Sequence, residues 1–134
     1  MRRLQLLSVG LLFVLASTIT GAAFAQDDLV DLVVGLLNDP DKDVRAVALE
    51  QIRAEAAGEE ATKKFAALLP DLSPLAQEEL LSALADRGDK AAAPAVRKFL
   101  QEGQAGNIRI AAVKALGKLG STEDLPTLLS YLNS

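Results

Sequence analysis

The chain repeats itself every 32 residues from about Leu29 to its C-terminus, and the copies align without gaps. Segments 43–52, 75–84 and 107–116 share four apolar columns: Val44/Ala76/Ile108, Ala48/Leu80/Ala112, Leu49/Leu81/Val113 and Ile52/Leu84/Leu116. Two further columns run through four copies: Leu29/Ala61/Ala93/Leu125 and Leu36/Leu68/Leu100/Leu132. A chain with such a repeat builds stacked units that bury a continuous core between neighbours and present an extended surface.

Apolar residues recur in every segment with a period of 3.6, and no run alternates apolar and polar residues as a half-buried strand would. We therefore expect seven helices, at 28–37, 43–57, 59–69, 74–87, 90–102, 107–119 and 122–132. Turn residues separate the helices at 38–41, 70–74 and 103–107. We expect Gly58, Gly88 and Gly120 to end the second, fourth and sixth helices in a left-handed conformation. Pro94 and Pro126 fit the first turns of the fifth and seventh.

The composition allows a sizeable core and excludes several chemistries. Half of the 134 residues are apolar but only 4% are aromatic, so Ala, Leu and Val must do the packing. The sequence has no Cys and no His. Thiolate, imidazole and disulfide chemistry are therefore excluded.

The first 25 residues are typical of a secretory signal peptide. Arg2 and Arg3 precede an apolar run at 6–16, and the small-x-small sequence Ala23-Phe24-Ala25 precedes Gln26. The alternative is an uncleaved anchor, because residues 4–25 are just long enough to span a bilayer. We expect cleavage, because the second half of this segment is only weakly apolar. This predicts a signal peptide at 1–25, a repeat domain at 26–134 and an exported protein, periplasmic or extracellular, with no membrane contact after cleavage.

The predicted mature chain is acidic. Arg2 and Arg3 lie in the signal segment, which leaves 12 basic and 18 acidic residues and a net charge of −6. Binding to nucleic acid depends mainly on neutralising phosphates, so we expect no nucleic-acid partner.

Three segments resemble HEAT repeats. They are DPDKDVRAVALEQI at 39–52, LADRGDKAAAPAV at 84–96 and NIRIAAVKALGKLG at 107–120. They are most similar to the short type often called phycobilisome-lyase HEAT-like, here in an exported bacterial protein. The resemblance covers about 109 residues, 26–134. It implies an all-α, right-handed α-solenoid of about three and a half HEAT-like hairpins with a 32-residue period. It implies little about function, because one fold serves many roles.

Asp39, Asp41, Asp43 and Glu50 stand at positions 1, 3, 5 and 12 of a would-be calcium loop. The sixth position of such a loop needs a sharp turn, normally at glycine, and Val44 stands there. We expect instead that Asp41 or Asp43 caps the helix that follows. No metal and no cofactor are predicted.

Arg45 and Arg109 lie beside the apolar stripes of their helices. In the HEAT family the corresponding arginine and an aspartate of the preceding turn form a ladder between repeats, and Asp39 and Asp71 match the aspartate column. Gln77 and Gly103 depart from the pattern. The resemblance therefore implies an incomplete structural ladder rather than a ligand site.

Catalytic residues are scarce. The hydroxyl groups have no adjacent base, and Glu59 and Glu60 are helical neighbours that do not face each other. A thin stack also offers no deep pocket. We expect no enzymatic activity.

The second helix of each HEAT hairpin lines the concave face, so its exposed residues are the candidate partner contacts. They are Glu50, Arg53, Glu78, Ser82, Asp86, Ile110, Lys114 and Lys118, with Ala46 and Ala85 between them. Two further candidate contacts, Leu128 and Leu132, lie on the last helix. This helix also carries the apolar residues Leu125, Leu129 and Tyr131. Apolar surface of this extent indicates an interface, with a homodimer, a partner or a further domain.

We predict a protein-interaction or scaffolding module whose partner the sequence does not identify. One alternative is an N-terminal or truncated accessory region of a larger exported enzyme. A second alternative is the lyase or chaperone-like role that the short HEAT-like type implies. It is weaker, because the chain has no aromatic or thiol cluster to hold the pigment that such lyases handle.

Overall fold

The computed structural model of the chain describes residues 26–54 and 58–134. The predicted signal peptide and its cleavage site, and the predicted end of the second helix at residue 57, lie outside the described residues. The described ranges contain seven α-helices, three short 3-10 helices and no strand. The α-helices are α2 (Gln26–Leu37), α3 (Lys42–Ala54), α4 (Glu59–Ala67), α5 (Pro74–Arg87), α6 (Ala93–Gln101), α7 (Gly106–Leu119) and α8 (Leu125–Leu132). The 3-10 helices are η1 (Leu69–Asp71), η2 (Lys90–Ala92) and η3 (Thr122–Asp124).

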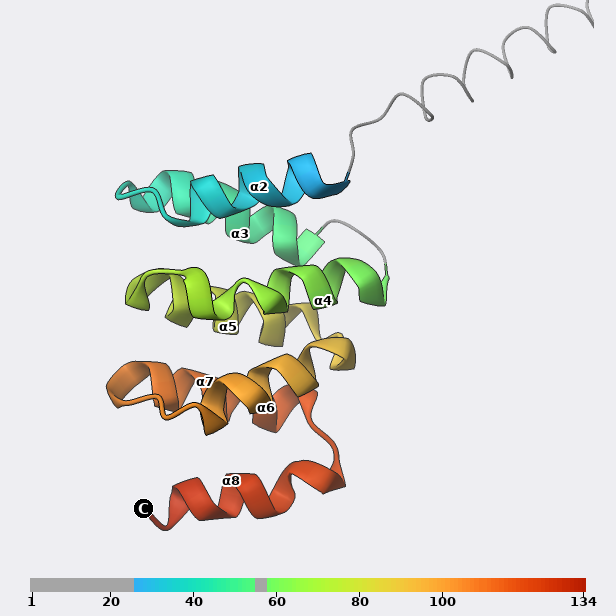
Figure 1. Cartoon of the computed structure of the whole chain (residues 1–134), viewed down its shortest axis with the longest axis vertical. Helices are drawn as coiled ribbons and strands as arrows, with labels where there is room; N and C mark the ends of the chain where they lie inside the picture. Colours follow the sequence, from blue (N-terminus) through green and yellow to red (C-terminus); the bar gives the residue numbers. More distant parts are fainter. Residues whose placement is uncertain (1–25, 55–57) are drawn as a thin grey trace, which may run out of the picture.

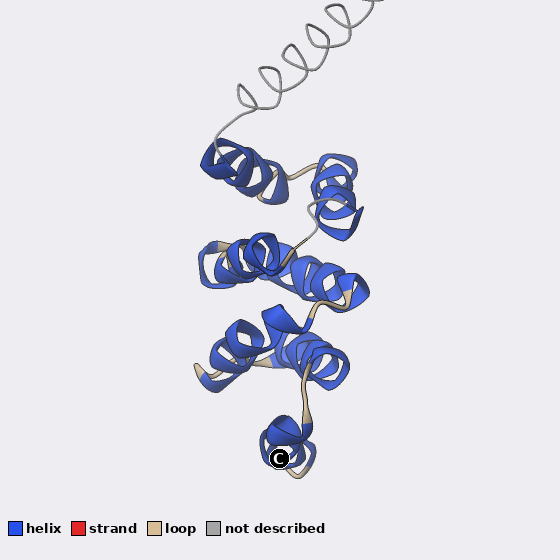
Figure 2. Ribbon diagram, turned by 90° about the vertical axis from the view of Figure 1, so that its right-hand side faces the viewer, coloured by secondary structure: helices blue, strands red, loops and turns tan. Residues whose placement is uncertain are grey.

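The helices form a stack two layers deep. Figure 1 shows α2, α4, α6 and α8 one below the other, with α3, α5 and α7 behind them. Figure 2 shows the stack from the side. Within the second layer α5 packs against both α3 and α7, and within the first layer α4 packs against α6. The chain thus forms the all-helical solenoid expected from its repeat, and the handedness of the stack stays a prediction.

The core consists of the apolar columns that repeat in the sequence. Ala48, Leu80 and Ala112, one residue from each copy, are fully buried. Leu81 and Leu84 are fully buried as well. Alanines in these columns allow neighbouring helices to approach closely, which is why so few aromatic residues are needed.

The fifth and seventh helices begin later than expected, each after a 3-10 turn. The Asp89 carboxylate accepts a hydrogen bond from the backbone N–H of Ala91, 3.0 Å away, and ends the loop before η2. Ser121 accepts from the backbone N–H of Glu123 in the same way before η3. These side chains hold the backbone in the tighter turn that often precedes an α-helix.

One of the three glycine predictions needs correction. Gly88 ends α5 at φ 71°, as expected. Gly58 has the expected positive φ, 118°, and stands directly before α4, while the helix end that it was predicted to close lies outside the described residues. Gly120 follows α7 at φ −74°, so the left-handed prediction is wrong there. Position 120 has no room for a side chain, because a Cβ would lie 2.6 Å from both Asp124 Oδ2 and the backbone carbonyl oxygen of Leu116.

Candidate functional site

A groove runs along the second layer between α5 and α7. It is partly open to solvent, with a volume of about 650 Å³. Six of the ten predicted contact residues line it: Glu78, Ser82, Asp86, Ile110, Lys114 and Lys118. The repeat brings them together because α5 and α7 are equivalent helices packed side by side. The helical surface predicted from sequence is therefore a concave site in the folded chain.

Ion pairs of Asp86 connect the groove to α3. The Asp86 carboxylate lies 3.2 Å from Arg53 Nε of α3 and 3.8 Å from Lys118 Nζ of α7. All three side chains are at least one-third exposed, so this chain of ion pairs contributes little to stability. It does link three predicted contact residues on α3, α5 and α7, the equivalent helices of three successive repeats. Glu50, also predicted, is exposed on α3 but lies outside the groove.

The floor of the groove is apolar and built from small residues. Leu81, Ala85, Ala111 and Ala115 line it between the charged walls. Ile110 stands beside them with 52% of its surface exposed. Because three of these four side chains are alanine, a bound segment can approach the helix backbones closely there.

Arg45 ties one repeat to the next, as the resemblance implied, but through a different partner. Its Nε and Nη2 atoms lie 2.8 and 3.3 Å from the two carboxylate oxygens of Glu79 on α5. Its Nη1 atom donates to the backbone carbonyls of Asp39 and Pro40, both at 2.9 Å. The bond to Glu79 raises the pKa of Arg45. The Asp39 carboxylate instead accepts the backbone N–H of Asp41.

The other copies do not repeat this ladder. Gln77 of α5 donates its amide to the carbonyl of Leu69, 2.8 Å away, within its own repeat. Arg109 is half-buried and makes no hydrogen bond or ion pair to any described residue. The interpretation of Arg45 as structural is thus confirmed, whereas Arg109 has no such role within the part of the chain that the structure describes.

A second polar cluster joins α3, α4 and α5 and was missed in the sequence. Arg87 Nε donates to Thr62 Oγ1 at 2.7 Å, and Arg87 Nη1 donates to the carbonyl of Ile52 at 2.9 Å. The Thr62 hydroxyl in turn donates to the Asp89 carboxylate at 2.6 Å, which lowers the pKa of Asp89. Thr62 is fully buried. Its column holds Pro94 and Pro126 in the next copies, so the repeat gave no signal of this role.

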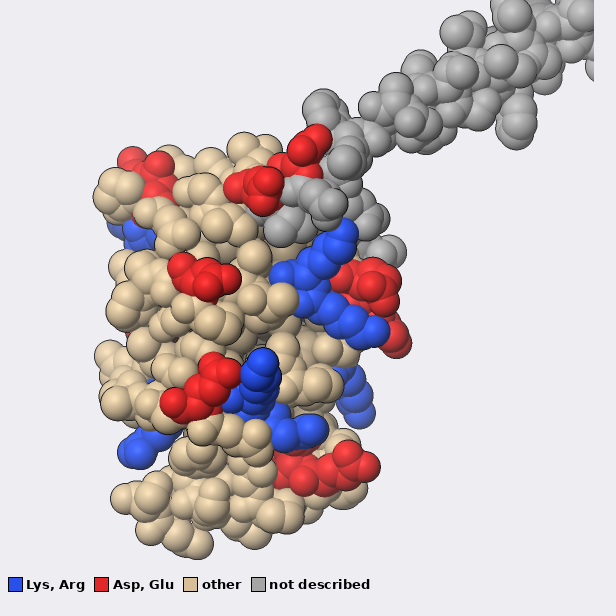
Figure 3. Space-filling view, in the orientation of Figure 1, with Lys and Arg blue, Asp and Glu red and all other residues tan. Residues whose placement is uncertain are grey.

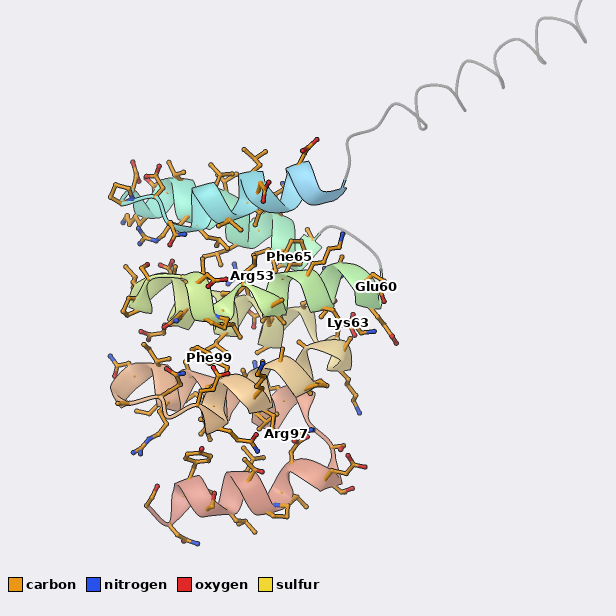
Figure 4. All side chains as sticks on the ribbon, in the orientation of Figure 1. Arg53, Glu60, Lys63, Phe65, Arg97 and Phe99 are labelled. Atoms are coloured by element: carbon orange, nitrogen blue, oxygen red, sulfur yellow. The ribbon has the colours of Figure 1, made fainter. Side chains whose placement is uncertain are left out.

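A third cluster attaches the last helix to the stack. Arg97 of α6 forms an ion pair with Asp124, whose other oxygen accepts the backbone N–H of Ser121 at 2.9 Å. Asp124 is only 1% exposed, and Figure 4 shows Arg97 between α6 and α8. The bond from Arg97 lowers the pKa of Asp124. A buried carboxylate thus anchors the start of α8.

The last helix covers only part of its own apolar surface. Leu128 and Tyr131 pack against the core, and the Tyr131 hydroxyl donates to the Leu100 carbonyl at 3.1 Å. Leu128 is therefore half-buried rather than a fully available contact residue. Leu125, Leu129 and Leu132 are 52%, 55% and 73% exposed. The helix has no charged residue, and in Figure 3 the surface over it is uncharged except at its N-terminal end.

The acidic turn 39–43 caps a helix. Asp41 accepts the backbone N–H of Asp43 at 2.8 Å, as the capping prediction required. Across 26–54 and 58–134, no three acidic side chains cluster closely enough to coordinate a metal ion.

In the same two ranges, no helix has both the length and the apolar character needed to cross a bilayer.

The comparisons with known proteins bear on the family alone. Searches of curated proteins and of solved structures gave no match. The family profile described as HEAT repeats matches residues 62–134, more than half of the chain. This range contains both walls of the α5–α7 groove and the whole of α8. The chain therefore belongs to the HEAT repeat family.

Proposed function

We propose that the protein is an exported interaction or scaffolding module that binds a partner protein along its second layer and has no catalytic activity of its own. HEAT repeats generally mediate protein interactions. The observation that carries the proposal is the groove between α5 and α7, where predicted contact residues from two repeats line one concave surface.

The scaffold behind the groove is well fixed. The Arg45–Glu79 pair and the bond from Arg87 to the Ile52 carbonyl each join α5 to α3 of the preceding repeat. These contacts hold α5, one wall of the groove, in place, and α7 packs along it, so a partner meets a largely preformed surface.

The groove chemistry favours binding over catalysis. Its hydroxyl group is that of Ser82, and the titratable groups around it are Glu78, Asp86, Lys114 and Lys118. Asp86 already pairs with Lys118. A nucleophile would need an oriented base beside it, and no hydrogen bond links Ser82 to one of these groups among the described residues.

Site-specific photo-crosslinking in the exporting cell tests the binding surface. We place a photoreactive phenylalanine derivative at Ser82, in the groove, and separately at Gln101, an exposed position of α6 in the first layer. We expect a discrete crosslinked species from Ser82 that is absent from Gln101. Identical crosslinks from both positions, or none from Ser82, would contradict the proposal.

Export rests on residues 1–25, and intact-mass measurement tests it. We expect the mature protein to begin at Gln26. A mass that retains Met1 to Ala25 would indicate an anchored protein. The accessory region of a larger exported enzyme remains the alternative, and the lyase or chaperone-like role of the short HEAT-like type remains the weaker one.

The exposed leucines of α8 favour a second role in self-association. Leu132 is 73% exposed, although its counterpart one repeat earlier, Leu100, is fully buried. Leu125 differs from Ala93 in the same way. We propose that a second copy covers this face in a homodimer. Light scattering should show a dimer that Leu129→Glu with Leu132→Glu converts to a monomer. A monomeric wild-type protein would refute this role and leave the groove proposal intact.

A further inference from the structure

We propose that the groove between α5 and α7 binds an acidic segment of the partner protein, anchored by one apolar side chain. The inference rests on the proposed function and adds the chemistry of the segment that binds. It rests on the basic residues of α7, on the pairing of Asp86 with both Arg53 and Lys118, on the position of Glu78 at the other end of the groove, and on the apolar floor of the groove.

The α7 wall is basic in an otherwise acidic chain. The charged residues with which α7 lines the groove are Lys114 and Lys118, and the helix carries no acidic residue, whereas the whole chain has a net charge of −4. Lys114 is exposed in the groove and forms no ion pair with any residue that the structure describes. The Lys118 side chain is 65% exposed, and its distance to Asp86 is 3.8 Å. Lys114 is therefore available to a ligand, and Lys118, one helical turn away, can exchange its long contact with Asp86 for a contact with the ligand.

Asp86 does not neutralise this end of the groove. It is shared between Lys118 and Arg53, and its bond to Arg53 is the shorter, at 3.2 Å. Of the side chains that line the groove, Lys114 and Lys118 lie on the α7 side of this carboxylate, and Arg53 of α3 pairs with it from outside the groove. An acidic ligand group at this end would meet a net positive charge.

The other end of the groove carries a negative charge, Glu78, which determines the orientation of the bound segment. Glu78 lies eight residues before Asp86 on α5, which is about 12 Å along a helix axis. Glu78 makes no ion pair with other described residues. A bound segment should thus place its carboxylates near Lys114 and Lys118 and keep them away from Glu78.

The floor accepts one apolar group of moderate size. Ile110 is 52% exposed next to Ala111 and Ala115, so covering it removes apolar surface from water. A leucine side chain one helical turn from the acidic pair would reach Ile110 while the carboxylates reach the lysines. The apolar floor favours a protein segment over nucleic acid, whose phosphates would use the charge but leave Ile110 uncovered.

Fluorescence anisotropy with two labelled peptides tests the inference. The acidic probe is a fluorescein-labelled twelve-residue peptide with two Glu residues and one Leu a turn away, and the basic probe has Lys in place of both Glu residues. We expect the purified protein to bind the acidic peptide about tenfold more tightly than the basic one, and the difference to shrink as salt is added. Equal binding of the two peptides, or binding of neither at millimolar protein, would overturn the inference.

Matched variants place the binding on this groove. Lys114→Glu with Lys118→Glu should weaken binding of the acidic peptide about tenfold or more. The same charge change at Lys90 and Lys98, exposed positions of η2 and α6, should change the affinity for this peptide less than about twofold. If both double variants lose binding alike, the attraction is merely that of net charge and the inference fails.

The variant Asp86→Asn should strengthen binding rather than weaken it. Removing the carboxylate that pairs with Arg53 and Lys118 should raise the affinity for the acidic peptide about two- to fivefold. Unchanged or weaker binding would contradict the assigned position of the acidic group. Equal competition by a single-stranded oligonucleotide of the same charge would assign the groove to nucleic acid and overturn the inference.

The two proposals fail separately. Crosslinking at Ser82 depends on contact and not on the charge of the partner. A specific crosslink together with no preference for the acidic peptide would leave the interaction module standing and refute only the acidic segment.

Discussion

Asp124 is the residue whose change should most selectively detach one helix from the stack. It is buried, and its two carboxylate oxygens accept from two different donors, Arg97 Nε and the Ser121 backbone N–H. The substitution Asp124→Asn keeps the shape but leaves only one oxygen. The amide NH₂ must then face a second donor, so one of the two bonds is lost whichever way the amide turns.

The magnitude follows from these two bonds. A hydrogen bond to a charged group contributes about 1.5–3 kcal/mol, and leaving a buried donor unsatisfied costs about 1–3 kcal/mol. The Arg97 side chain is 32% exposed, so solvent screens its share and lowers the sum. We expect Asp124→Asn to reduce the free energy of unfolding by about 2–3 kcal/mol. Asp71→Asn, at an exposed aspartate with no side-chain partner among the described residues, should change it by less than about 0.5 kcal/mol.

The loss should depend on pH in a stated direction. The folded-state pKa of Asp124 is lowered by Arg97, so the carboxylate stabilises the fold fully above the unfolded-state pKa, about 3.9. The stabilisation is lost as pH falls from there through the lower folded-state pKa. The difference between wild type and Asp124→Asn should thus be full at pH 7 and shrink below about pH 4.

Urea unfolding at several pH values gives the free energies, and amide hydrogen exchange shows where protection is lost. We expect faster exchange in α8 and little change in α3 and α5. A cost below about 0.5 kcal/mol at pH 7, or a loss of protection spread evenly over the stack, would refute the assignment of Asp124 as the anchor of α8.

Three further predictions concern the core, the close approach after α7, and metal binding. Leu81→Ala should cost about 2–5 kcal/mol, because Leu81 is fully buried, and Glu50→Ala should cost little; equal costs in chemical denaturation would show that the helical faces are wrongly assigned. Gly120→Ala should cost about 1–3 kcal/mol, because the new methyl group meets Asp124, whereas Gly117→Ala meets no neighbouring helix and should stabilise by about 0.5–1 kcal/mol; thermal unfolding that ranks the two the other way would contradict this. Millimolar calcium should leave the melting temperature unchanged relative to chelator, and a rise of several degrees that chelator reverses would revive the calcium loop.

The repeat predicted the apolar part of the fold because burial there follows a fixed period. Columns such as Ala48/Leu80/Ala112 occupy the same place in each copy and are buried in each. The exposed face of the second helices was predicted for the same reason, and α5 and α7 then formed a groove because equivalent helices pack side by side. What the sequence did not predict is that the groove ends in a shared carboxylate, Asp86.

The polar clusters were not predictable from the repeat because the repeat does not pair their members. The column of Arg97 holds Val33, Phe65 and Leu129, so a comparison of copies treats the arginine as variation. The column of Asp124 holds Asp28, Glu60 and Ala92, so an acidic residue recurs there, but nothing in the column identifies Arg97 as its partner. Their partners are also 25–27 residues apart, less than one repeat, so no column pairs them.

Gly120 shows how such a cluster changes local structure. Gly88, one repeat earlier, takes the left-handed conformation that commonly ends a helix. After Gly120 the chain must instead bring Ser121 onto the Asp124 carboxylate, and the backbone passes close over that side chain at φ −74°. Two glycines in one column thus serve different purposes, one conformational and one steric.

The same buried carboxylate decides how the apolar edge of α8 can be used. Because Asp124 and the Tyr131 hydroxyl bind α8 to α6, the helix presents Leu125, Leu129 and Leu132 in a fixed orientation. A partner that docks on this edge needs little reordering of the helix, which favours affinity. If Asp124 is neutralised and α8 loosens, association through this edge should weaken, while binding in the α5–α7 groove, on the other layer, should persist.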